Sequence, residues 1–205
     1  IAFYLYWFFR LINMTIFLAI SYLRLSLEKD TDWMAQIQLV DHLDTVLKDF
    51  RKKQPLPLPK RLLRTLRYLD FKTLHRSRRR PPPSEEIFHL IIYPVVKEDR
   101  DILEPAILSL KDQKFPTSRM LVVYALEERA EERIKEAVFV LEKKYKSDFL
   151  DVQVMVHPAD RPGEARVKGA NVTWAARQAT AYLENKKIPF ENVIVSCFDA
   201  DTVVS

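Results

Sequence analysis

Two carboxylates stand one residue apart in the sequence VIVSCFDADTVVS, residues 193–205. Asp199 and Asp201 follow a short apolar run that has the character of a buried strand. In an extended segment, residues two apart point the same way, so both carboxylates could face one site. Hard cations such as Mg²⁺ or Mn²⁺ accept carboxylate oxygens and leave positions open for phosphate. The pair predicts a divalent cation that holds a phosphorylated ligand; the alternative is a solvated turn, because Asp is common in turns.

The elements before this pair alternate between apolar runs of strand length and helical segments with one apolar face. We expect strands at 87–96, 119–126, 150–158 and 192–198, and helices at 101–114, 130–145 and 168–187. Strands that are apolar on both faces and alternate with helices are typical of βαβ units in a parallel sheet covered by helices. The predicted fold class is therefore α/β with a mostly parallel sheet.

Ligands of open α/β sheets bind at the carboxyl ends of the strands. Further charged residues that follow the predicted strands should meet Asp199 and Asp201 at this edge: Glu127, Glu128, Arg161, Arg166 and Lys168. Acids beside bases suit a cation that holds a phosphorylated ligand. The chain has only two glycines, so neither of the glycine-rich phosphate-binding motifs is present.

The first 25 residues are largely apolar and carry two charges, Arg10 and Arg24. In the interpretation that we prefer, residues 1–9 are the last part of a membrane-spanning helix, with aromatic side chains and Arg10 at the interface. Residues 11–25 would then lie at the membrane surface. In the alternative, residues 1–25 form one imperfect span with an arginine inside it.

A strongly basic stretch follows at residues 48–80, which contain 13 Lys and Arg but only two acids, Asp49 and Asp70. This stretch carries +11, so the remainder of the chain carries −6 of the total of +5. We expect contact with anionic membrane lipids, because the stretch lacks the interleaved aromatic residues of a single-strand nucleic-acid platform. Nucleic acid is not an expected partner. The positive-inside tendency places the domain that follows on the cytoplasmic side.

The sequence HRSRRRPPPSEE, residues 75–86, has the composition of a linker. We therefore divide the chain into a transmembrane or interfacial segment at 1–25, basic juxtamembrane helices and linker at 26–83, and an α/β domain at 84–205. The single cysteine, Cys197, excludes an internal disulfide and is expected to pack inside a buried strand. The first residue is Ile1, and the chain stops soon after Asp201, so we expect it to be a fragment.

Four blocks in this order resemble the N-terminal, donor-binding half of membrane-associated family 2 glycosyltransferases of the GT-A fold. They are HLIIYPVVKEDRDILEPAILSLKDQKFP, MLVVYALEERAEE, RVKGANVTWAARQA and VIVSCFDADTVVS. The resemblance covers about residues 87–205. It implies a Rossmann-like nucleotide-sugar-binding half and the inverting, metal-dependent transfer of a sugar from a UDP- or GDP-linked donor.

The resemblance also implies roles for single residues. Asp199 and Asp201 match the family's D-x-D, which holds the donor diphosphate through Mg²⁺ or Mn²⁺. The residues implied to bind the donor are Pro94, Glu98, Glu127, Glu128, Lys168, Asn171 and Asp199. The family's general base lies downstream of D-x-D, so we expect it beyond Ser205. The competing hypothesis is a membrane-tethered basic binding module with a non-catalytic α/β domain.

Overall fold

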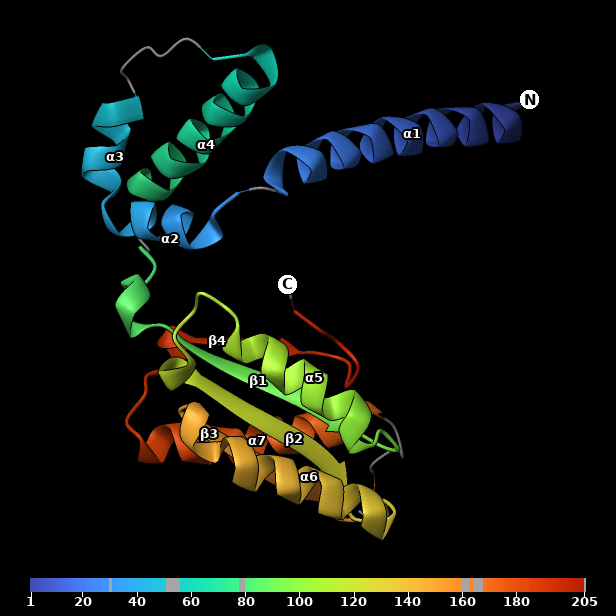
Figure 1. Cartoon of the computed structure of the whole chain (residues 1–205). Coiled ribbons are helices and arrows are strands. Elements are labelled where there is room, and N and C mark those ends of the chain that lie inside the picture. The colour runs from blue at the N-terminus through green and yellow to red at the C-terminus, as the bar shows by residue number, and fades with distance from the viewer. Residues whose placement is uncertain (30, 51–55, 78–79, 160–162, 164–167, 205) are drawn as a thin grey trace. The chain divides into compact units, whose positions relative to one another are not determined.

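The structure is a computed structural model that describes residues 1–29, 31–50, 56–77, 80–159, 163 and 168–204. The chain divides into two compact units, Ile1–Pro81 and Pro82–Ser205 (Figure 1). The secondary structure described in the first unit consists of α-helices, and the second unit alternates strands with helices.

The first unit begins with α1 (Ala2–Glu28), one helix that continues through Arg10 without a break. The Arg10 guanidinium donates a hydrogen bond to the Tyr6 hydroxyl over 2.9 Å and lies 5.3 Å from the centre of the Trp7 ring. By length and composition, Ala2–Ser26 is able to cross a membrane, and its apolar side chains are not buried within the unit. The backbone therefore does not separate residues 1–9 from residues 11–25.

The described residues of the first unit form three more helices: α2 (Trp33–Asp41), α3 (Leu43–Phe50) and α4 (Leu58–Arg76). The apolar spacing of α3 and α4 creates a small core in which Leu43, Val46 and Phe71 are buried. The rest of α4 carries many of the cations of the basic stretch, and most of its side chains are exposed or half-buried.

The second unit confirms the predicted α/β class. Its elements are β1 (Phe88–Val95), α5 (Arg100–Lys111), β2 (Met120–Glu127), α6 (Glu132–Tyr145), β3 (Asp151–His157), α7 (Lys168–Asn185) and β4 (Val193–Cys197). All four strands are parallel, in the order β3-β2-β1-β4. The chain thus winds from β1 outward to β3, and α7 then returns it to the other side of β1.

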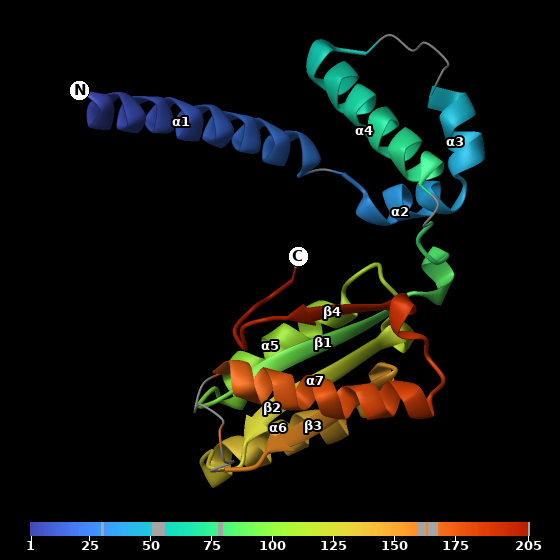
Figure 2. The same cartoon turned by 180° about the vertical axis from the view of Figure 1, so that it is seen from behind.

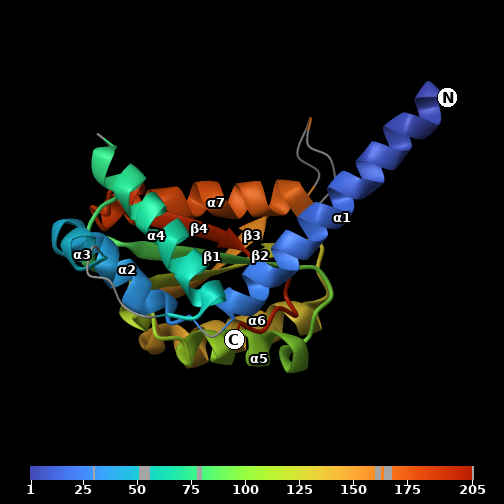
Figure 3. The same cartoon turned by 90° about the horizontal axis from the view of Figure 1, so that it is seen from above.

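The helices cover both faces of the sheet. Helices α5 and α6 pack on one face and α7 packs on the other, as Figures 2 and 3 show from behind and from above. Alternate residues of the same strand serve the two cores: Ile91 and Tyr93 pack with α5 and α6, whereas Leu90 and Ile92 pack with α7. Burial on both faces explains why these strands read as continuous apolar runs.

Strand β4 differs from its prediction. We expected 192–198 to be buried and Cys197 to pack inside it, yet Ile194 is 53% and Val195 58% exposed, and Cys197 is exposed as well. The reason lies in the strand order. β4 is an edge strand that pairs only with β1 among the described strands, and α7 packs chiefly on β1, β2 and β3.

Candidate functional site

The winding of the sheet reverses between β1 and β4. The connection after β1 leads through α5 to β2 on one side, and the connection through α7 leads to β4 on the other side. Loops at such a switch point diverge, and ligands of open α/β sheets bind in the crevice that this leaves. The Phe198 N–H donates to the Ile92 carbonyl over 3.1 Å, so the pairing with β1 continues up to the residue before Asp199.

Asp199 and Asp201 lie in a turn at this switch point. The Thr202 N–H donates to the Asp199 carbonyl over 2.9 Å, so the segment is not extended as we expected. Between the two acids, Ala200 is 5% exposed and belongs to the core under α5 and α6. Both carboxyl residues remain exposed on either side of it. The buried alanine therefore anchors a turn that presents two acids at the surface.

Lys168, the first residue of α7, forms an ion pair with the Asp199 carboxylate. Its hydrogen bond with Asp199 raises the pKa of the Lys168 ammonium above its ordinary value, and the charge of Glu98 adds to this effect. The start of α7, the end of β4 and the loop after β1 therefore contribute charges to one place.

Glu98 is held by the backbone of its own loop. Its carboxylate accepts hydrogen bonds from the N–H groups of Val96, over 2.7 Å, and Lys97, over 3.0 Å. Partial burial opposes ionisation of Glu98, but these hydrogen bonds outweigh it and leave the pKa of the carboxyl below its ordinary value. Pro94, the other residue of this region that was expected to bind the donor, lies in β1 and is buried. Of the two residues, only Glu98 is partly exposed.

The two acids after β2 are engaged by neighbouring groups. The Glu127 carboxylate pairs with the Arg129 guanidinium at 2.5 Å. The Glu128 carboxylate accepts from the Ala159 N–H over 2.7 Å, and the Glu128 N–H donates to the His157 carbonyl over 2.9 Å. Glu128 thus ties the end of β2 to the end of β3. Arg129 was not among the predicted site residues, although its place two residues after Glu127 was a usable signal.

Asn171 lies beneath the surface of the site. It is 1% exposed, and its side-chain amide donates to the Ala125 carbonyl of β2 over 2.7 Å. Its side-chain oxygen has no hydrogen-bond partner within the described part of the chain. Asn171 therefore anchors the first turn of α7 to the sheet. Arg161 and Arg166, which we expected at this edge, lie outside the described residues.

The carboxylates of Asp199 and Asp201 have the donor chemistry that Mg²⁺ or Mn²⁺ prefers. Among the residues that the structure describes, no group of three or more His, Cys, Asp or Glu side chains is arranged to hold a metal. A cation at this turn would therefore take its remaining ligands from phosphate oxygens and water.

Comparison of the chain with protein-family models, curated proteins and solved structures finds no match. The fold and the site by themselves define an α/β protein with a four-stranded parallel sheet and an N-terminal apolar helix. Charged residues of both signs meet at the switch point of its sheet.

Proposed function

We propose that the chain is the donor-binding half of an inverting, metal-dependent glycosyltransferase of the GT-A fold at the cytoplasmic face of a membrane. It would bind the diphosphate of a UDP- or GDP-linked sugar at the β1/β4 switch point. One observation carries this proposal: the D-x-D turn follows β4 directly, and its first carboxylate is paired with a lysine from the start of α7.

The residues of this site suit a Rossmann-like nucleotide site. Asp199 and Asp201 would hold Mg²⁺ or Mn²⁺, which when bound neutralises the charge that grows on the leaving nucleotide diphosphate. Lys168 lies at a helix N-terminus, where an ammonium group and the first backbone N–H groups of the helix favour phosphate. Glu127, at the end of β2, would contact the base or ribose.

The ion pair between Lys168 and Asp199 suggests how these groups respond to the donor. A diphosphate that attracts Lys168 would release the Asp199 carboxylate for the cation. Donor and cation would then bind together, each improving the site for the other. These residues bind and orient the donor, and none of them is assigned as the general base.

The second candidate is a membrane-tethered basic module whose α/β domain is not catalytic. It is favoured by the state of Asp199, whose charge is already matched by Lys168. Under this hypothesis the turn at Asp199 is a surface feature, and the basic stretch carries the function through its contact with lipid.

Titration of the whole chain with UDP and with GDP separates the two candidates. We expect calorimetric binding of one nucleotide in the presence of Mn²⁺ and its loss on addition of EDTA. Asp201→Asn should abolish the metal-dependent binding with the fold unchanged by circular dichroism, and Asp199→Asn should weaken it. Asp112→Asn is the matched control, because this exposed acid follows the far end of α5. Binding of neither nucleotide, or binding indifferent to EDTA and Asp201→Asn, would support the second candidate.

A further inference from the structure

The helical unit contains a cavity of about 660 Å³ beside α3 and α4. This volume lies within the range of small-molecule sites, roughly 300–1,000 Å³. Its wall combines apolar side chains, among them Leu39 and Leu56, with charged ones. Such a wall suits a ligand that has both an apolar and a charged part.

The charges of the cavity are predominantly positive. Lys60, Arg64 and Arg67 line it from α4, where spacings of four and three residues place side chains on the same side of a helix. Among the described residues that line the cavity, Asp49 is the one carboxylate. The cavity therefore attracts anions.

The two arginines are held in place at the cavity wall. The Arg64 guanidinium donates to the Phe50 carbonyl over 3.1 Å and lies 5.6 Å from the centre of the Phe50 ring. The Arg67 guanidinium donates to the Thr31 hydroxyl over 2.9 Å. Neither Arg67 nor Lys60 forms an ion pair with a carboxylate in the described part of the unit. Their charges are thus available to an anionic ligand.

The cavity also adjoins the helix that is able to cross a membrane. Ser26, the last residue of the candidate span Ala2–Ser26, is one of its lining residues. A basic pocket at the end of such a helix lies where lipid headgroups gather, and arginine forks match the geometry of phosphate oxygens.

We propose that this cavity binds the phosphoryl headgroup of one anionic membrane lipid. Lys60, Arg64 and Arg67 contact the phosphate, and Leu39 and Leu56 contact the first part of the acyl chain. The site is distinct from the diffuse attraction of the whole basic stretch. It does not depend on the proposed glycosyl transfer.

The test counts lipids that remain bound to the whole chain in detergent, by native mass spectrometry after incubation with phosphatidylglycerol or phosphatidylcholine. We expect the wild type to retain phosphatidylglycerol in preference to phosphatidylcholine. Arg67→Gln should lower this retention about tenfold, as expected for the loss of a charge-assisted hydrogen bond. Leu56→Trp should lower it as well by filling the cavity without a change of charge.

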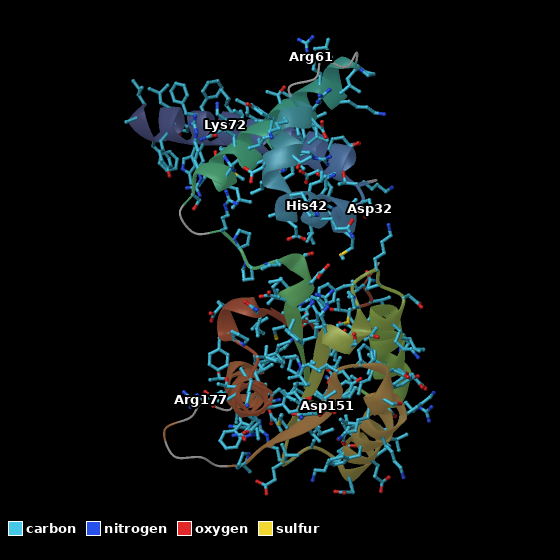
Figure 4. All side chains as sticks on the ribbon, turned by 90° about the vertical axis from the view of Figure 1, so that its left-hand side faces the viewer. Asp32, His42, Arg61, Lys72, Asp151 and Arg177 are labelled. Atoms are coloured by element: carbon cyan, nitrogen blue, oxygen red, sulfur yellow. The ribbon has the colours of Figure 1, made fainter. Side chains whose placement is uncertain are left out.

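Arg61→Gln is the matched control. Arg61 is exposed, does not line the cavity, and points outward from the beginning of α4, as Figure 4 shows. Arg61→Gln removes the same charge from the same helix as Arg67→Gln. Because Arg61 does not line the cavity, retention of phosphatidylglycerol should stay near the wild-type level. Equal losses for Arg61→Gln and Arg67→Gln would overturn the proposal, because net charge would then explain the retention.

Two further outcomes would also overturn the proposal. Equal retention of phosphatidylcholine would show that the cavity does not recognise an anionic headgroup. Complete displacement of the lipid by inorganic phosphate, at an ionic strength matched with chloride, would assign the cavity to the free ion. We expect phosphate to displace little lipid, because it makes no contact with the apolar wall.

Discussion

Lys168 and Asp199 are 31 residues apart in the chain and form an ion pair at the switch point of the sheet. Lys168 begins the helix that covers one face of the sheet, and Asp199 follows the edge strand β4. Both groups are exposed, so the pair adds little to stability. Under the proposed function, a cation would replace Lys168 as the partner of Asp199, and a phosphate would replace Asp199 as the partner of Lys168.

Lys168→Ala should weaken nucleotide binding by about tenfold, because a charge-assisted contact to the diphosphate is lost. Glu98→Ala should have a smaller effect, since the Glu98 carboxylate is occupied by the N–H groups of its own loop. Calorimetric titration of both variants with UDP or GDP and Mn²⁺ measures the difference. Equal losses for the two variants would contradict the assignment of Lys168 to the phosphates.

Lys168→Ala should have the opposite effect on the affinity for the cation in the absence of nucleotide. Without Lys168, the Asp199 carboxylate is no longer paired, so Lys168→Ala should bind Mn²⁺ several-fold more tightly than the wild type when no nucleotide is present. The loss of the free Mn²⁺ signal in electron paramagnetic resonance measures this. Unchanged Mn²⁺ affinity would mean that Asp199 is not a ligand of the cation.

Asn171→Ala should lower the free energy of unfolding by roughly 1–3 kcal/mol, because the buried Ala125 carbonyl loses its donor. Chemical denaturation followed by circular dichroism measures the change. Asn185→Ala, at the exposed end of the same helix, is the control and should have little effect. A loss of nucleotide affinity with unchanged stability would instead place Asn171 in contact with the ligand.

Glu104 should make stability depend on pH in the acid range. Its carboxylate accepts from Arg100, Lys144 and Tyr145, and these hydrogen bonds lower its pKa from 4.5 to about 2. Since the folded-state pKa is the lower one, the stabilisation is fully present above about 4.5 and is lost as the pH falls toward about 2.

Glu104→Gln should therefore destabilise the fold by roughly 1–2 kcal/mol at neutral pH, and the difference from the wild type should shrink as the pH approaches 2. Thermal unfolding between pH 2 and pH 7 measures it, with Glu136→Gln on the exposed side of α6 as control. A difference that does not change with pH would show that the carboxylate charge is not the stabilising feature.

The basic stretch should bind anionic membranes without α1. A chain that begins at residue 29 should sediment with phosphatidylglycerol vesicles at low salt and should be released by high salt, because surface charges are screened. Vesicles of phosphatidylcholine should not bind it. If this chain stayed in solution at low salt, the basic stretch would have no role at the membrane.

Much of the fold could be predicted from local pattern. The apolar runs that became β1 and β2 are buried on both faces, so their composition alone marks them as central strands. The pattern of β4 looks the same, but its exposed Ile194 and Val195 show that composition does not reveal which strand lies at an edge. The turn at Asp199 was only the alternative to an extended segment, because the Thr202 N–H that closes it carries no signal in the sequence.

The sequence by itself determined the features that depend on neighbouring residues: an apolar helix, a basic stretch after it, and alternating strands and helices with two acids after the last strand. The tertiary structure alone decided that β4 pairs with β1 instead of extending the sheet beyond β3. That choice follows from α7, which crosses the face opposite α5 and α6 and packs on Leu90 and Ile92. Long-range packing of this kind is invisible in local sequence, and it brings Lys168 to Asp199 and anchors Asn171 beneath them.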